Sequence, residues 1–197
     1  MTSGAAVLRQ DREQLLQSAE QLFYSHGIQS VTMQQVRDVA ELPLKRIYQL
    51  YPSKDELVVA FLKRRNTRML AGVAAAVDAA PGPDRGLAVF DWLHRWFSEP
   101  GFRGCAWINA FGELGAVNAA VAAEVRRHKR AFLRLMIDAL AGDGYSRETA
   151  KTLFLLVEGA IVTAAIQRSV TPATEAKAAA RVLLAAARAG PTQPPGR

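Results

Sequence analysis

Three basic side chains fall close together in a stretch of the sequence that contains no acidic residue. From Leu42 to Lys54 the charged residues are Lys45, Arg46 and Lys54 itself, which gives a local charge of +3. Arginine and lysine bind phosphate oxygens and the acceptor edge of guanine, and the amide of the nearby Gln49 is suited to adenine. The stretch therefore has the chemistry of a surface that reads DNA.

Two short helices are predicted to position these side chains, over residues 33–40 and 44–50, with a tight turn at Glu41 and Leu42 between them. Helices this short are not stable alone in water, so they must pack on longer neighbours. A helix-turn-helix has this arrangement: the first helix braces the second, and the second presents its N-terminal half to the major groove. The pattern predicts a DNA-binding helix-turn-helix.

The ends of these elements carry recognisable signals. Gly27 suits a left-handed C-terminal cap after a first helix over residues 10–25. Thr32 and Gln35 have the form of a capping box, in which each side chain bonds to the backbone N–H of the other residue. Pro43 stands near the first position of the second short helix, where its missing N–H costs little. These signals predict where the helices begin and end.

Helical spacing of apolar residues continues along the chain, and no segment alternates apolar and polar residues long enough to predict a strand. We predict an all-α fold with an N-terminal helix-turn-helix three-helix domain over residues 8–53 and a larger C-terminal helical bundle over residues 54–190. Residues 1–7 and 191–197 are predicted to be disordered. The expected helices, about nine in all, are 10–25, 33–40, 44–50, 54–77, 84–97, 104–114, 119–141, 147–168 and 172–189.

Composition excludes several classes of protein. The chain has 197 residues and a formal net charge of 25 − 18 = +7, which suits an anionic partner but also an ordinary solvated surface. Its single cysteine, Cys105, excludes an intramolecular disulfide, and the scattered histidines lack zinc-site spacing, so we expect no metal. The longest apolar stretch, Leu153 to Ile166, is shorter than the roughly 20 residues of a membrane helix. We expect a cytoplasmic protein without a membrane partner.

A set of residues from the first helix to the start of the fourth has a distinctive order and spacing: Ala19, Leu22, Phe23, Gly27, Val31, Thr32, Met33, Val36, Ala40, Leu42, Ile47, Tyr48 and the run from Tyr51 to Leu57. In this order and spacing, residues 10–60 resemble the DNA-binding domain of TetR-family (tetracycline-repressor-like) transcriptional regulators. Where this family commonly has glycine in the turn, the present chain has Glu41.

The resemblance implies a role for each outward-facing residue of the helix-turn-helix. Thr32, Tyr48 and Lys54 would contact phosphates, which fixes the register of the protein on the duplex. Lys45, Arg46 and Gln49 would reach base edges, together with Gln34 from the bracing helix. Leu44 lies on the same outer side.

The resemblance also implies that residues 54–190 bind a small molecule and form a homodimer through the last two long helices. Such a dimer would set two recognition helices against a palindromic operator. Aromatic side chains at helical spacing are otherwise core residues, and Glu158 could instead lie at the dimer interface. The candidate ligand-binding residues are Trp92, Trp96, Trp107, Asn109, Phe111, Phe154 and Glu158.

Three functional hypotheses follow from these features. The leading one is a repressor that a small apolar ligand releases from its operator. The alternative is a dimeric DNA-binding protein without small-molecule input. An all-helical enzyme is not supported, because the G-x-S-x-G, Gly-rich phosphate-loop and H-E-x-x-H patterns are missing, and we expect no cofactor.

Overall fold

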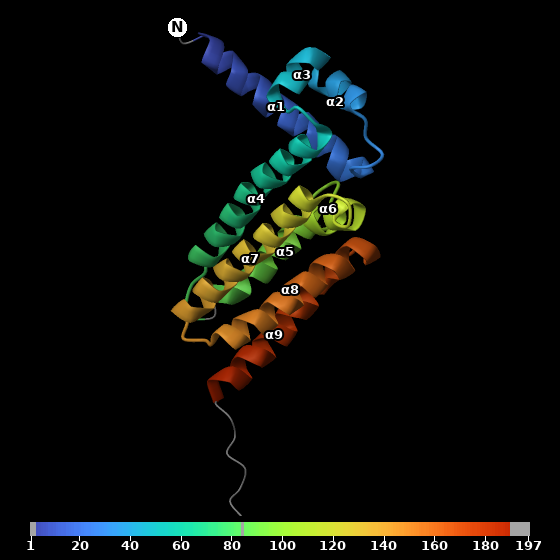
Figure 1. Ribbon diagram of the computed structural model, residues 1–197. Helices are drawn as coiled ribbons and strands as arrows, with labels where there is room; N and C mark the ends of the chain where they lie inside the picture. Colours follow the sequence, from blue (N-terminus) through green and yellow to red (C-terminus); the bar gives the residue numbers. More distant parts are fainter. Residues whose placement is uncertain (1–2, 84, 190–197) are drawn as a thin grey trace, which may run out of the picture. The chain divides into compact units, whose positions relative to one another are not determined.

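Helices make up all the regular structure in residues 3–83 and 85–189, the part of the chain that the computed structural model describes (Figure 1). The predicted all-α fold of nine α-helices is confirmed over these residues. The elements are α1 (Ser3–His26), α2 (Met33–Ala40), α3 (Leu44–Leu50), α4 (Lys54–Asp78), the 3-10 turn η1 (Arg85–Leu87), α5 (Ala88–Phe97), α6 (Ala106–Leu114), α7 (Ala119–Gly142), α8 (Arg147–Gln167) and α9 (Thr171–Ala189).

The helix starts that differ most from the predictions are those of α1 and α5; α6 and α9 begin within two residues of their predicted starts. α1 begins at Ser3, so residues 3–7, for which disorder is predicted, are helical. Ala5, Ala6 and the residues after them are good helix formers, and no stop signal precedes them. α5 begins at Ala88 because residues 85–87 form a 3-10 turn. The predicted disordered tail, residues 191–197, lies outside the described residues.

The helices form two compact units, and each unit consists of two separate segments of the chain. The first, here called the head unit, comprises the chain up to Arg68 together with Cys105–His128. The second, the bundle unit, comprises Met69–Gly104 together with the chain from Lys129 onward. Thus α6 and the first part of α7 pack with the helix-turn-helix. The predicted division between residues 53 and 54 stays a prediction.

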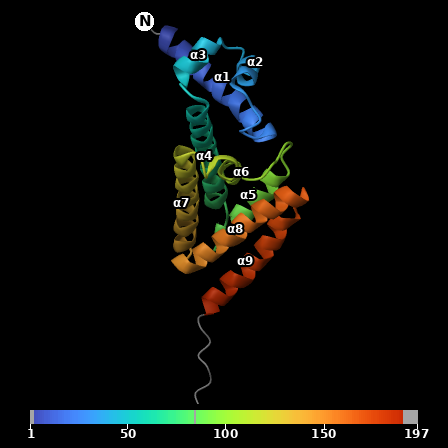
Figure 2. The same ribbon diagram turned by 45° about the vertical axis from the view of Figure 1, so that its right-hand side comes forward.

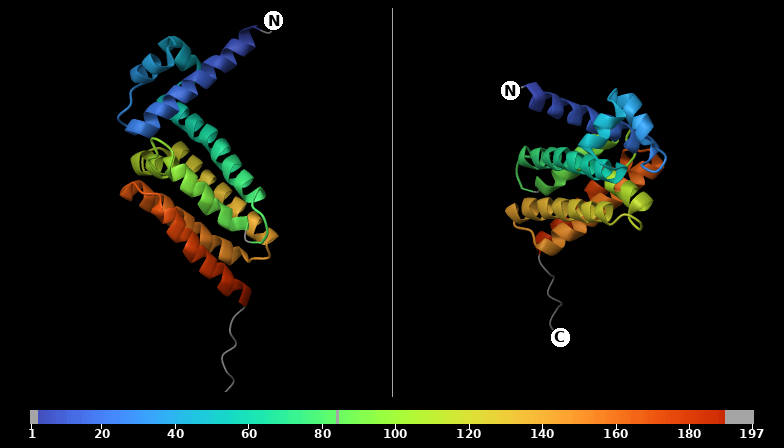
Figure 3. Two further views of the ribbon diagram at one scale, coloured as in Figure 1. Left: turned by 180° about the vertical axis from the view of Figure 1, so that it is seen from behind. Right: turned by 45° about the horizontal axis from the view of Figure 1, so that its top comes forward.

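The head unit has a core to which each of its first four helices contributes. In this unit α2 packs against α1 and α3 against α2 (Figure 3). Ile47, the fully buried residue of α3, stabilises the unit by roughly 1.5–3 kcal/mol relative to an exposed position. The buried residues of α1 to α4 include Leu15, Ala19, Phe23, Val36, Ala40, Ile47, Leu57, Val58 and Phe61.

In the bundle unit, α8 and α9 lie side by side and α5 packs against both (Figure 2). By length and composition α8 is the one helix of the described residues that could cross a membrane, a test that the core helix of a soluble protein also passes. Some of its apolar side chains are solvent-exposed, with 69% of Leu155 and 77% of Ile166 accessible. Val162 of α8 and Val182 of α9 are also exposed. We call these four residues the apolar α8–α9 face.

Candidate nucleic-acid interface

The start of α2 is fixed by the predicted capping box. The Thr32 backbone N–H donates to Oε1 of Gln35 at 2.7 Å, and the Gln35 backbone N–H donates to Oγ1 of Thr32 at 3.2 Å. Two N–H groups that the helix would leave without partners are therefore satisfied. α2 runs over Met33–Ala40 as predicted, with Gln34 and Gln35 exposed on its first turn.

The turn between α2 and α3 uses a left-handed residue. Glu41 has φ 50° and ψ 32°, a conformation that glycine adopts without strain. The Ala40 carbonyl before it accepts a 2.7 Å hydrogen bond from Nε2 of Gln14 on α1. Pro43 then caps α3, and its carbonyl accepts from the N–H of Ile47 at 3.1 Å. The turn is thereby held against α1.

The recognition helix α3 divides into an inner and an outer face. Ile47 and Leu50 are buried against the head unit, and Leu44 is half-buried at the edge. Lys45 and Gln49 are exposed, and Tyr48 has 44% of its surface accessible. The outward set predicted from the sequence is confirmed as exposed for these three residues, which can meet a DNA groove without any change in packing.

Arg46 is placed differently from its neighbours. It lies on the flank of α3 that faces α1, where Nε donates to Oδ2 of Asp11 at 2.6 Å. The Arg46 side chain is 29% accessible and that of Asp11 17%. Sequence reasoning missed Asp11, because no spacing rule links residues that are 35 positions apart.

Lys54 is the first residue of α4. It lies beside the exposed face of α3 formed by Lys45, Tyr48 and Gln49, which we call the reading surface. Ser53 caps this helix, since its Oγ accepts from the N–H of Glu56 at 3.1 Å. Nζ of Lys54 lies 6.0 Å from the centre of the Phe23 ring. Partial burial lowers the pKa of Lys54 from its usual value, and the carboxylates of Glu113 and Asp55 oppose that shift. Lys54 thus places a basic side chain at the N-terminus of α4, and helix N-termini favour phosphate.

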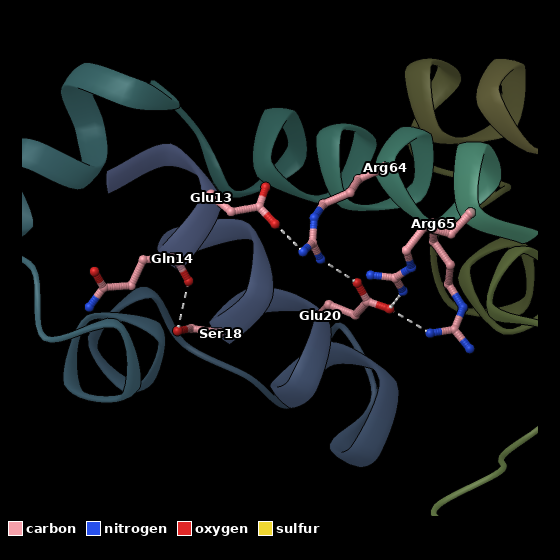
Figure 4. Close-up of polar contacts among 7 residues, drawn as sticks. Glu13, Gln14, Ser18, Glu20, Arg64 and Arg65 are labelled. Atoms are coloured by element: carbon pink, nitrogen blue, oxygen red, sulfur yellow. Dashed lines mark hydrogen bonds and ion pairs between the residues drawn. The ribbon is translucent and has the colours of Figure 1, made fainter. Parts of the chain in front are cut away.

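A cluster of arginines fixes α4 on α1 within the head unit (Figure 4). The Glu20 carboxylate accepts from Nη1 of Arg64 at 2.8 Å and from Nη1 of Arg65 at 2.7 Å, and it also pairs with Arg68. Arg64 pairs in addition with Glu13. Burial raises the pKa of Glu20, but Arg68 and Arg65 outweigh burial, so that the net shift is downward. We call Glu20 and the three arginines the Glu20 cluster.

A second contact fixes the loop that precedes α2. The Gln29 backbone N–H donates to Oε2 of Glu113 at 2.7 Å, and the Gln29 side chain donates to the Glu113 carbonyl at 2.6 Å. Gly27 has φ +88° at the predicted left-handed cap, close to the same carboxylate. Thus α6 holds the segment between α1 and the capping box, a contact that local sequence patterns did not indicate.

The comparisons with known proteins agree with this geometry. Residues 15–61 match the model for bacterial regulatory proteins of the tetR family. The chain is 25% identical over 186 residues to the HTH-type transcriptional repressor NemR of Escherichia coli K12, an alignment that covers 88% of this chain and 94% of that protein. Residues 15–61 thus match the DNA-binding part of the tetR family, and most of the chain is similar to a repressor that carries this part.

Solved TetR-family structures have the same fold. A TetR-family transcriptional regulator from Streptomyces coelicolor superposes with a TM-score of 0.80 at 28% identity, covering 89% of this chain and 94% of that one. Reduced NemR of E. coli gives a TM-score of 0.79 at 25% identity, covering 88% and 96%. These likenesses identify the protein as a DNA-binding transcriptional regulator and not an enzyme.

The seven candidate ligand residues of the protein divide between the two units. Trp92 and Trp96 lie in the bundle unit with ring centres 5.2 Å apart, within a packed aromatic cluster. Phe154 meets Phe132 edge-on, and Glu158 pairs with Lys129. In the head unit Trp107 is buried, whereas Asn109 and Phe111 are exposed on α6.

Trp107 has the most unusual surroundings of the seven. Its ring stacks on His128 at 3.5 Å with an interplanar angle of 5°. Nδ1 of His128 lies 2.7 Å from Oδ1 of Asn66. The indole Nε1 of Trp107 is buried and has no hydrogen-bond partner in the described part of the chain. A buried donor without an acceptor is rare in native proteins.

The bundle unit also has an open groove of about 490 Å³ between the end of α4 and the second half of α7. None of the seven candidates lines it. Its lining residues are Ala74, Val77, Asp78, Arg85, Ala131, Arg134, Leu135, Asp138 and Ala139.

Among the described residues no group of histidine, cysteine and acidic side chains is arranged to hold a metal ion, and Cys105 is buried.

Proposed function

We propose that this protein is a cytoplasmic, homodimeric repressor that binds a palindromic operator and is released from it by a small apolar ligand. The observation that carries the proposal is the outer face of α3, where Lys45, Tyr48 and Gln49 are exposed on a helix whose other side is buried. The relative NemR, itself a transcriptional repressor by name, supports the sign of regulation.

Each predicted DNA-contact residue has a role in this proposal. Thr32, Tyr48 and Lys54 bind phosphates and set the register of the protein on the duplex. Leu44 borders the reading surface and meets the apolar edge of a base pair. The residues that read base edges are Gln34, Lys45, Arg46 and Gln49.

The dimer is proposed to form through α8 and α9. The apolar α8–α9 face, which includes Leu155 and Ile166, would otherwise stay in water. A two-fold axis beside these helices would place two copies of α3 about 34–36 Å apart, one turn of B-DNA. The half-sites of the operator would then be related by the same symmetry.

The effector site is proposed to include Trp107. Its buried indole N–H suits a ligand that is mostly apolar and carries one hydrogen-bond acceptor. A typical coupling of about 1–3 kcal/mol between effector and operator would change DNA affinity by about 5–150-fold. Replacing Trp107 with Phe keeps a ring and removes the donor, and should weaken the binding of such a ligand.

The alternative is a dimeric DNA-binding protein without small-molecule input. The dense packing of Trp92 and Trp96 with Phe97 and Phe102 favours it, since ring centres 4.9–5.2 Å apart leave no space between them. A screen of small apolar compounds by thermal shift separates the two hypotheses. Compounds that stabilise the protein and weaken its binding to DNA favour the effector hypothesis.

The deciding experiment is a binding titration against the intergenic DNA upstream of the protein's own gene, at two salt concentrations, with scrambled duplex as control. Tight binding at one palindromic stretch that persists at the higher salt supports the proposal. Equal, salt-sensitive binding to both duplexes refutes it. Lys45→Ala should remove the preference for the palindromic stretch over scrambled duplex. Lys63→Ala, which changes an exposed lysine of α4 away from α3, should keep that preference.

A further inference from the structure

The ion pair between Asp11 and Arg46 joins the helix before the helix-turn-helix to the recognition helix. Both side chains are mostly withdrawn from water, and the 2.6 Å bond uses Nε of the guanidinium and one carboxylate oxygen. Charged hydrogen bonds of this length hold both groups in a fixed geometry. The direction of Arg46 is therefore set by α1 rather than by its own rotamer preferences.

The end of the guanidinium stays available. Asp11 is the one hydrogen-bond partner of the Arg46 side chain among the described residues, so the two terminal nitrogens form no bond to that part of the chain. A guanidinium held at Nε presents these nitrogens as a planar fork. Such a fork matches O6 and N7 of guanine.

Asp11 itself stands on a well-fixed element. One turn further along α1, Gln14 bonds to the Ala40 carbonyl at the end of α2. Further along, Glu20 ties α1 to α4 through the Glu20 cluster. A carboxylate on so rigid a helix can orient its partner, whereas one on a mobile loop could not.

We infer that Asp11 is a positioning residue for DNA reading: it holds Arg46 so that the terminal nitrogens face a guanine in each operator half-site. This inference rests on the proposed function, and it adds a residue outside the helix-turn-helix to the determinants of sequence preference. Asp11 itself contacts no base. Its negative charge opposes phosphate binding, so its removal weakens specific binding without weakening non-specific binding.

The test begins with selection of the preferred duplex from a random library by the full-length wild-type protein. At each selected guanine, 7-deazaguanine is then substituted, which removes the N7 acceptor alone. Wild-type protein should lose affinity at one guanine per half-site, by about 5-fold or more, as expected for a bidentate contact. In Asp11→Asn the loss of affinity that 7-deazaguanine causes at this position should be at most half as large as in wild type. In Arg46→Ala the base analogue should cause no loss of affinity at this position.

Asp38→Asn is the matched control, because Asp38 forms an exposed ion pair with Arg37 in the same helix-turn-helix. It should leave the effect of 7-deazaguanine unchanged. Affinity for scrambled duplex provides the second readout. It should stay the same or rise in Asp11→Asn, whereas a merely structural loss would lower both specific and non-specific binding. Circular dichroism melting confirms that each variant is folded.

Two results overturn the inference. If Asp11→Asn and wild type respond equally to 7-deazaguanine, the pair only joins α1 to α3. If Arg46→Ala weakens all duplexes by the same factor, Arg46 reads no base. A selection in which wild-type protein enriches no sequence would instead refute the proposed function itself, and with it the premise of the inference.

Discussion

Replacing Glu20 with Gln should destabilise the protein through the Glu20 cluster. The carboxylate is 13% accessible and accepts from three arginines, whose side chains range from 14% to 52% accessible. Breaking a buried ion pair costs about 3–5 kcal/mol, but water reaches part of these guanidinium groups and reduces that penalty. We therefore expect a loss of about 2–3 kcal/mol in the free energy of unfolding.

Urea unfolding at pH 7 measures this loss. A change of 2–3 kcal/mol corresponds to a fall of about 4–12 °C in Tm for a chain of this size. Asp138→Asn is the control, since Asp138 pairs with Arg134 at an exposed site, and it should change stability by less than about 0.5 kcal/mol. A Glu20→Gln variant within about 0.5 kcal/mol of wild type would refute the reasoning.

The same cluster predicts a dependence on pH with a definite sign. The pKa of Glu20 is held below its usual value of 4.5, so folding favours the charged carboxylate. The stabilisation is complete above the pKa of the unfolded chain and is lost as the pH falls through the lower pKa of the folded state. The difference between wild type and Glu20→Gln should therefore shrink as the pH falls below about 4.5, and a constant difference would contradict this account.

Four further outcomes follow from single contacts. Thr32→Ala removes the capping box and should cost about 1 kcal/mol in urea unfolding, while Thr32→Ser should keep most of it. Glu41→Gly relieves a left-handed residue and should raise the free energy of unfolding by up to about 1 kcal/mol; a loss would mean that the turn is not strained. Lys54→Ala should weaken binding to all duplexes and flatten the salt dependence by about one unit of slope, and an unchanged slope would exclude a phosphate contact. Ile166→Asp should give monomers in sedimentation if the apolar α8–α9 face forms the dimer, and an unaltered oligomeric state would exclude that face.

The bounds of α2 and α3 were predictable because each signal acts within a few residues. The capping box, the turn at Glu41 and the cap at Pro43 all depend on near neighbours in the sequence. The start of α1 was not predictable in this way. Nothing in residues 3–9 ends a helix, and the choice between an ordered and a disordered extension carries no local signal.

The contacts that hold the reading surface in place were beyond prediction for a different reason. Asp11 and Arg46 are 35 residues apart, Glu20 and Arg64 are 44 apart, and Gln29 and Glu113 are 84 apart. A single sequence gives no information on which charges meet over such separations. For the ligand-binding residues the reason is different again: aromatic residues at helical spacing, such as Trp92 and Trp96, give the same sequence pattern in a core and in a pocket.

The composition of the head unit has a consequence for synthesis on the ribosome. Its second segment, Cys105–His128, emerges only after residues 69–104 have been made. Until then the Gln29 amide has no Glu113 carboxylate to bind, and Asn66 has no His128 beside it. The helix-turn-helix therefore emerges early but is completed late. A fragment that ends at Arg68 should accordingly be less stably folded than the head unit of the whole chain, because it lacks the same contacts as this unfinished intermediate.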